Sequence, residues 1–349
     1  MQPTPDITGL LEAALQTARN TGLTAKAVRK EPKANGGRAA ALIRIGRGTQ
    51  QKEYAVEVKR GLRPATLGTA LHQIERFGQP GLLVADYITP PMAGRLREHG
   101  VPFLDAAGNA YLEQPGIFVW VVGNRPAAPA VPPALGRAFQ PTGLQVVFAL
   151  LCNPAAVNQP YRELGAMAGV AHGTVGWVMP ELQREGFIAG LEGGRGMRRL
   201  FKRDRLAAQW TDAYARLLRP RMLLGAYYVT NDATWRDWPI RQHGALWGGE
   251  AAGALLTDYL RPGELTLYAD KVPAVLAARN KFLANPEPGH TLRVEVRRRF
   301  WQFTVPDVRT DVTPPLLVYA DLLATGEARC MDTARMVYDT HVHRLVAQD

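Results

Sequence analysis

The stretch EYAVEVKRGL, residues 53–62, places a charged pair inside an apolar segment. Residues 53–59 predict a β-strand, in which successive side chains point to opposite faces. Glu57 and Lys59 are two residues apart, so their side chains should share one exposed face. There they would form a surface ion pair of small energetic value.

The segments on both sides of this strand predict an alternation of helices and strands. Helical apolar spacing, prolines at helix starts and glycines at helix ends indicate helices over 7–22, 67–78 and 90–100. Short apolar runs indicate further strands over 40–45, 81–88, 101–112 and 116–122. The order helix, two or three strands, helix, strand, helix, strand predicts an α/β sandwich.

This order, with the E-x-K strand, resembles the PD-(D/E)xK nuclease fold, also called restriction-endonuclease-like. Its chemistry needs a carboxylate on the preceding strand and the Glu of E-x-K to hold Mg²⁺, while the Lys orients the attacking water. Residues 35–51 contain no Asp or Glu, and they carry three cations instead: Arg38, Arg44 and Arg47. Glu12, Glu31 and Asp105 are substitutes that nothing in the sequence brings to the site.

The sequence therefore favours an inactive nuclease remnant, Glu57 and Lys59, with no metal and no cofactor. A metal-dependent DNA endonuclease stays the alternative. In a third interpretation Lys59, Arg60 and Arg63 hold a phosphate backbone without metal.

Proline and turn residues mark two connections. Four prolines between Pro126 and Pro133 predict an extended linker over 126–140, and Pro220 should stop the helix before it. Asp105, Gly108 and Asn109 are explained by a tight turn between strands. The predicted domains are 1–125, 141–220 and 221–349.

Residues 141–186 predict three helices, the last two over 161–168 and from about His172 to Glu185, joined by a turn at Gly169. This is the pattern of a helix-turn-helix, whose second helix lies in the major groove. Outward side chains should meet DNA, namely Tyr161, His172, Thr174 and Trp177. Inward ones should face the core, namely Val175, Val178, Met179 and Leu182. Pro180 should bend the second helix.

Two strands, 187–192 and 197–203, should follow as the wing of a winged helix, separated by the glycine-rich segment GGRG. Six cations against one Asp lie between Arg195 and Arg205, and such a hairpin suits phosphate contacts. The candidate contacts are Arg195, Arg198, Arg199, Lys202 and Arg203. A hairpin that is only solvated, or that docks protein, is the alternative.

The distribution of charge along the chain supports DNA binding by the first two predicted domains. Residues 1–125 hold 16 Lys and Arg against 10 Asp and Glu, residues 126–220 hold 11 against 6, and residues 221–349 hold 15 against 15. The basic part favours nucleic acid, and the neutral part favours a protein partner. The two cysteines, Cys152 and Cys330, lack metal-ligand spacing and predict core positions in a reducing cytoplasm. No apolar run is long enough to span a membrane.

The last third predicts a mixed α/β domain. It should have a helix over 250–259, strands over 265–269, 292–297 and 299–303, and a helix pair broken at Gly326. Candidate metal ligands here are Glu250, Asp321 and Asp332, with His341 and His343 as another pair. Helix N-terminal and exposed positions explain the carboxylates, and two histidines at i and i+2 do not share a helix face. No catalytic set emerges.

Four segments together resemble the AbiEi-type transcriptional regulators, antitoxins of type IV toxin-antitoxin systems: VPFLDAAGNAYL, GVAHGTVGWVMPELQREGFI, WGGEAAGALLTDYLRP and LLVYADLLATGEAR. The resemblance implies a repressor of its own operon that binds repeated operator sequences. It also implies a nucleotidyltransferase-like toxin encoded nearby. Only residues 161–186 and the wing carry over as DNA-binding positions.

The sequence thus predicts a cytoplasmic, non-enzymatic DNA-binding regulator with double-stranded DNA as its partner. In another hypothesis, residues 221–349, which carry no net charge, form an interaction module. This module binds the toxin or assembles a homodimer.

Overall fold

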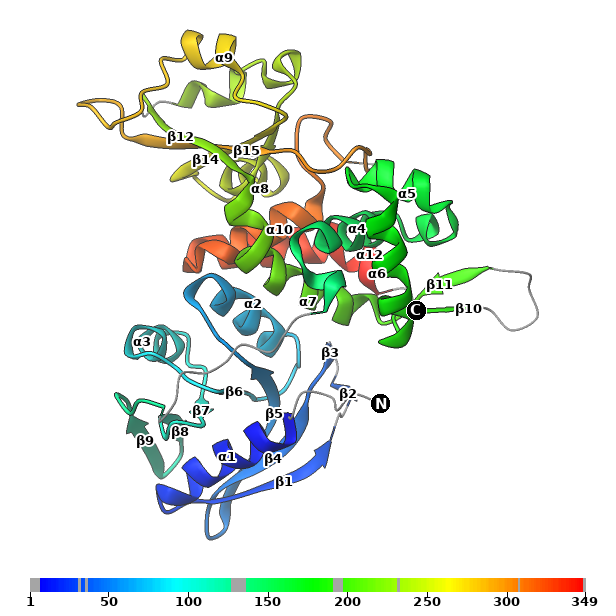
Figure 1. The fold of residues 1–349 in the computed structure, drawn as a ribbon. Coiled ribbons are helices and arrows are strands. Elements are labelled where there is room, and N and C mark those ends of the chain that lie inside the picture. Colours follow the sequence, from blue (N-terminus) through cyan, green and yellow to red (C-terminus); the bar gives the residue numbers. More distant parts are fainter. Residues whose placement is uncertain are drawn as a thin grey trace. The chain divides into compact units, whose positions relative to one another are not determined.

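The computed structural model describes residues 7–30, 33–34, 37–126, 136–190, 197–230, 233–306 and 308–347 (Figure 1). The chain divides into two compact units, Met1–Ala134 and Leu135–Asp349, which are described separately. Most of the predicted linker lies outside the described residues. No helix in the described part of the chain combines the length and the apolarity needed to cross a membrane.

A seven-stranded sheet forms the centre of the N-terminal unit, in the order β1-β4-β5-β6-β7-β8-β9. The first three strands pair antiparallel, β5, β6 and β7 pair parallel, and the last three pair antiparallel. The strands are β1 Thr24–Lys30, β4 Ala41–Arg47, β5 Gln50–Lys59, β6 Gly81–Ala85, β7 Phe103–Asp105, β8 Ala110–Gln114 and β9 Ile117–Val121. A separate two-stranded pair is formed by β2 Lys33–Ala34 and β3 Gly37–Arg38.

Helices cover both faces of the large sheet. α1 (Ile7–Asn20) packs on the face that carries Val84. The next side chain in β6, Leu83, must point to the other face and is also fully buried. α2 (Pro64–Glu75) packs against β5 and β6, and α3 (Pro90–Glu98) follows β6. The three predicted helices are confirmed, whereas β1 and the β2–β3 pair were not located from the sequence.

The second unit begins with a helical region and a hairpin. Its elements are η1 Arg137–Phe139, α4 Pro141–Cys152, η2 Pro154–Asn158, α5 Tyr161–Ala168, α6 His172–Arg184, β10 Ile188–Gly190, β11 Arg198–Leu200 and α7 Arg203–Ala213. A four-stranded sheet follows, in the order β12-β15-β14-β13. The remaining α-helices and β-strands are β12 Leu223–Val229, β13 Leu246–Gly248, α8 Gly249–Thr257, β14 Glu264–Ala269, α9 Ala274–Arg279, β15 Leu292–Arg298, α10 Pro315–Thr325, α11 Ala328–Val337 and α12 His343–Val346.

An aromatic core joins the two halves of this unit. The ring of Phe148 in α4 lies 5.0 Å from Trp210 in α7, 5.2 Å from Phe300 and 5.9 Å from Trp301, measured between centroids. Aromatic rings at these separations attract each other beyond their area of burial. Residues on both sides of the predicted boundary at 220/221 therefore share one core.

The strand predicted over 299–303 is wrong. β15 ends at Arg298, and the following residues form no strand. Phe300 and Trp301 are adjacent in sequence and both buried, which the alternation of a half-exposed strand does not permit. The chain leaves the sheet here because both rings pack against Phe148.

Pro220 does not end a helix as predicted. α7 ends at Ala213, and a π-helical turn (Tyr214–Leu218) and a 3-10 turn (Arg219–Met222) carry the chain past Pro220 into β12. Proline is favoured in the first turn of a helix, because its missing N–H has no intrahelical partner there. Pro220 therefore stands at the start of the 3-10 turn.

Candidate nucleic-acid interface

α5 and α6 are joined by a tight turn that requires glycine. Gly169 ends α5 with φ of 65°, in the left-handed region that glycine adopts without strain. A Cβ added there would lie 2.9 Å from the carbonyl oxygen of Phe300. The N–H of Gln302 also donates to the carbonyl of Met167 at 2.8 Å. The turn is thus held against the segment that follows β15.

α6 has one buried and one exposed face, as predicted. Its buried apolar side chains are Val175, Val178, Met179 and Leu182, and Glu181 is buried as well. His172 and Trp177 are exposed, Thr174 is half-buried, and Trp177 keeps 62% of its surface in solvent. The helix runs through Pro180 to Arg184. The first two turns of α6 therefore present polar and aromatic groups to solvent.

Arg137 adds a cation to this face that was not predicted. Its guanidinium carbon lies 4.5 Å from the centroid of the Trp177 ring, within the range of a cation–π contact. Arg137 is in η1 and is itself exposed. This contact could not be expected from the sequence, since Arg137 falls in the predicted linker.

The β10–β11 hairpin is held beside α5 by Asn158. The side chain of Asn158 accepts from the N–H of Arg198 at 2.7 Å and donates to its carbonyl at 2.9 Å, so it pairs with β11 as a neighbouring strand would. The Arg198 side chain reaches Tyr161, with 3.3 Å from Nη1 to the hydroxyl. Tyr161 and Arg198, both predicted contacts, therefore meet.

The predicted hairpin cations do not share one environment. Arg199 is exposed, and Arg198 and Lys202 are half-buried. Arg195 lies outside the described residues. Arg203 begins α7 and is only 7% exposed, because it lies on the helix side that packs inward. Arg203 is thus buried, unlike the described cations Arg198, Arg199 and Lys202.

The Glu57–Lys59 pair is formed but is not on an open surface. Lys59 Nζ lies 3.3 Å from Glu57 Oε1, and the two side chains are only 14% and 16% exposed. The predicted exposed face is therefore wrong, because α2 packs over this part of β5. Of the proposed phosphate-binding cations, Lys59 and Arg60 are half-buried and Arg63 is exposed.

The neighbouring strand offers Glu57 no carboxylate. Ala41 pairs with Val56, and the N–H of Ala40 donates to the carbonyl of Val56, so Ala40 comes opposite Glu57. Arg44 further along β4 pairs with Glu53 instead. No group of three His, Cys, Asp or Glu side chains within metal-binding reach includes Glu57 in the described part of the chain.

Asp105 anchors a turn, as its sequence context suggested. The buried carboxylate accepts hydrogen bonds from the N–H groups of Ile88, Ala107 and Asn109 and from the Asn109 side chain, at 2.7–2.9 Å. Burial raises the pKa of Asp105, and the bonds from Asn109 oppose that shift. The carboxylate is committed to the β7–β8 connection.

The carboxylates considered in the last third are not brought together. Buried Glu250 is bound by Arg329, with 2.8 Å and 3.0 Å between nitrogen and oxygen atoms. Glu250, Glu327 and Cys330 form the one cluster of metal-ligand type among the described residues, and Arg329 also pairs with Glu327. Burial raises the pKa of the Cys330 thiol to about 12. Asp332 is exposed, and its Oδ1 lies 3.8 Å from Nη1 of Arg335.

His341 and His343 lie at the C-terminal end of the helical region, in a π-helical turn and in α12. They were the other candidate ligand pair. The described residues contain no metal-ligand cluster with either of them.

Asp321 is the centre of a buried polar network that the sequence did not reveal. It accepts from the hydroxyls of Tyr214 at 2.7 Å and Tyr268 at 2.9 Å, and from Arg219 Nε at 3.0 Å. Burial alone would lower the pKa of Arg219, but the Asp321 carboxylate reverses this and raises it. The network links α10, β14 and the turn after α7.

One comparison with known proteins bears on the chain. A family model described as transcriptional regulator, AbiEi antitoxin, Type IV TA system matches residues 199–343, from β11 to the start of α12. α5 and α6 lie outside the matched range. No curated protein and no solved structure matches the chain. Over residues 199–343, the protein is therefore similar to transcriptional regulators of the AbiEi antitoxin type.

Proposed function

We propose that the protein is a DNA-binding transcriptional regulator in which α5, α6 and the β10–β11 hairpin act as a winged helix-turn-helix. The observation that carries this proposal is the division of α6. Val175, Val178, Met179 and Leu182 are buried, while His172, Thr174 and Trp177 reach solvent, and the hairpin that follows α6 carries the exposed Arg199.

In this proposal the groups at the interface have separate tasks. His172 and Thr174 meet base edges in the major groove, since contacts to bases give sequence preference. Arg198 and Arg199 bind phosphates beside the groove and give affinity that depends on salt. Arg137, which stacks on Trp177, and Lys202, which follows β11, add further cations to the interface.

The matched range supports the biological role that we propose. Its similarity to AbiEi-type antitoxins supports a repressor of its own operon, with double-stranded DNA as partner and a nucleotidyltransferase-like toxin encoded nearby. The proposal assigns no catalytic activity to the chain.

The test is binding of the full chain to labelled duplex DNA from upstream of its own gene, against a scrambled duplex. The His172→Ala/Thr174→Ala variant should lose the preference for the upstream duplex and keep its affinity for the scrambled one. Each lost base contact is expected to cost about 1–3 kcal/mol of discrimination. Equal affinity of the unaltered protein for both duplexes would refute a sequence-reading α6.

A second proposal concerns the N-terminal unit. A restriction-endonuclease-like fold is supported by the order of its elements. α1 is followed by the antiparallel strands β1, β4 and β5, then by α2, and then by β6, which is parallel to β5. Ala40 opposite Glu57 supports the loss of the metal-binding pair.

Plasmid DNA that is incubated with the protein and Mg²⁺ or Mn²⁺ should stay uncut. Cleavage that disappears in Lys59→Ala would establish the nuclease alternative.

A further inference from the structure

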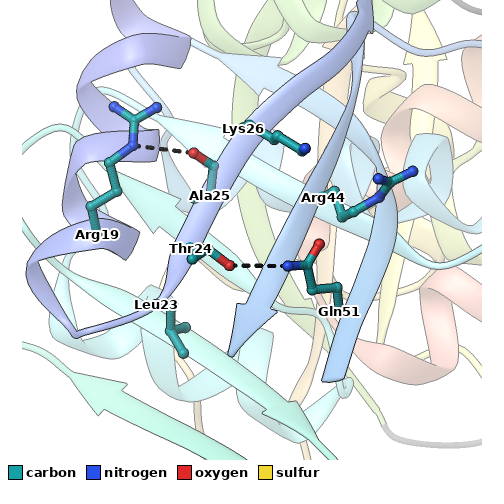
Figure 2. A pocket seen from close by; sticks show the side chains of 7 residues that line it. All are labelled: Arg19, Leu23, Thr24, Ala25, Lys26, Arg44 and Gln51. Atoms are coloured by element: carbon teal, nitrogen blue, oxygen red, sulfur yellow. Dashed lines mark hydrogen bonds between the residues drawn. The ribbon is translucent and has the colours of Figure 1, made fainter. Parts of the chain in front are cut away.

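A cationic hollow of about 410 Å³ lies on the N-terminal unit, at the edge of its sheet (Figure 2). It is formed by the end of α1, the edge strand β1 and the neighbouring β4 and β5. Three cations line it, Arg19, Lys26 and Arg44, and none of its lining residues is acidic. Its size is within the range of small-ligand sites.

The placement of Lys26 and Arg44 brings like charges together. They are directly opposite each other on antiparallel strands, and Figure 2 shows both side chains on the same side of β1. Like charges at opposed positions destabilise a strand pair. A bound anion would remove this repulsion.

Two carboxylates hold the guanidinium groups without filling the hollow. Arg19 Nη1 lies 2.6 Å from Glu12, and Arg44 pairs with Glu53. The Glu12 and Glu53 side chains are 63% and 44% exposed, so both pairs are weak and screened by salt. Arg19 Nε also donates to the carbonyl of Ala25 at 3.1 Å, which fixes its direction (Figure 2).

Each of the three cations at the hollow keeps a nitrogen that these hydrogen bonds do not use. Within the described residues, Arg19 Nη2, Arg44 Nη1 and Lys26 Nζ have no hydrogen-bond partner. Guanidinium groups bind phosphate through paired N–H donors, and an ammonium group acts as a point charge. Leu23 and Ala25, on either side of Thr24 in the chain, also line the hollow, and their side chains are buried.

We propose that this hollow is a binding site for phosphate groups, supplied by a nucleic-acid backbone or by the phosphate chain of a free nucleotide. The site goes beyond the proposed function, because it uses no residue of α6 or of the β10–β11 hairpin. Arg19 and Arg44 grip phosphate oxygens with their remaining N–H donors, and Lys26 neutralises the charge between them.

The test compares the Lys26→Gln/Arg44→Gln variant of the full chain with a matched control, Arg95→Gln/Arg125→Gln. The control removes the same charge from exposed positions of the same unit, outside the hollow. One arm measures binding of a nucleoside triphosphate by titration calorimetry. The other arm measures the salt dependence of duplex DNA binding.

A free-nucleotide site predicts that the hollow variant binds the triphosphate about tenfold or more weakly, with no change in the control. A nucleic-acid site predicts instead that the log–log salt slope falls by about 2, one for each cation removed. Both variants keep the cations of the β10–β11 hairpin. If the protein does not bind DNA through α6 and this hairpin, triphosphate binding still tests the hollow.

The proposal is overturned if the hollow variant and its control agree in both arms, or if the unaltered protein binds neither probe. Thermal melting checks that the variants fold. Should the double variant unfold, the single variant Lys26→Gln replaces it, because the Lys26 side chain is exposed. Its log–log salt slope should fall by about 1.

Discussion

Two arginine-rich strands in the same unit, β11 and β15, use their charge differently. On β11, Arg199 is exposed and Arg198 contacts the neutral side chain of Tyr161. On β15, the Arg297 side chain is 4% exposed and pairs with Glu295 on the same strand. Arg293 is bound by Glu295 at 2.7 Å and by Glu264 at 3.5 Å.

The difference shows that a count of cations does not measure the charge offered to DNA. Around β15, three carboxylates neutralise the guanidinium groups and make them part of the fold: Glu264, Glu295 and Asp321. Such a buried network holds the sheet, α10 and the turns after α7 in one arrangement. The β11 cations have no such set of carboxylates among the described residues.

The largest expected effect is on stability, from breaking the buried network. Asp321→Asn should lower the free energy of unfolding by about 3–5 kcal/mol, since it breaks the ion pair between the fully buried Asp321 carboxylate and the half-buried Arg219, which keeps Glu295 at 3.8 Å. Denaturant unfolding of the full chain measures this.

Asp332→Asn is the control, because Asp332 is on the exposed side of the neighbouring helix α11. It should change stability by less than about 0.5 kcal/mol. Similar losses in the two variants would mean that Asp321 contributes no more than a surface carboxylate.

A smaller effect, on DNA binding alone, is expected on β11. Arg198→Ala/Arg199→Ala should reduce the salt slope of duplex binding by about 2 and leave the melting temperature nearly unchanged. Anisotropy titrations between about 50 and 200 mM salt measure the slope.

The matched variant for β11 is Lys271→Ala/Arg279→Ala, two exposed cations near α9. Its slope should equal that of the unaltered protein. Binding that is unchanged in the β11 variant would remove the hairpin from the interface.

The smallest effect concerns pH near β15. Burial raises the pKa of Glu264 from 4.5 to about 7, and the nearby Glu295 adds to the shift. A raised pKa means that the folded state binds this proton more tightly than the unfolded state. The stability it contributes is complete below about pH 4.5 and is lost as pH rises through about 7.

Melting temperatures of the unaltered protein and of Glu264→Gln, from pH 5 to pH 8, measure the difference. The unaltered protein should lose stability relative to the variant as pH rises. Groups common to both proteins cancel in the comparison. A constant difference over this range would show that Glu264 titrates normally.

Sequence patterns predicted the local parts of the candidate interface well. The bounds of α5, the turn at Gly169 and the two faces of α6 all follow from apolar spacing and glycine conformation within about 25 residues. Trp177 was placed outward by the same spacing. Such features depend on near neighbours in the chain, so one sequence is enough to find them.

Features that depend on distant contacts were not predictable. Asn158 binds Arg198 across 40 residues, and Tyr214 binds Asp321 across 107. Arg199 and Arg203 look alike in sequence, and only the start of α7 separates an exposed cation from a buried one. The course of residues 299–303 was mistaken for the same reason, because Phe148 lies far away in the chain.

Hydrogen exchange of the full chain, with and without duplex DNA from upstream of its gene, tests whether α5, α6 and the β10–β11 hairpin bind DNA. We predict slower amide exchange on DNA binding in residues 161–166, 172–178 and 197–202, and little change in β12–β15. Unchanged exchange in those three segments at saturating DNA would contradict this prediction.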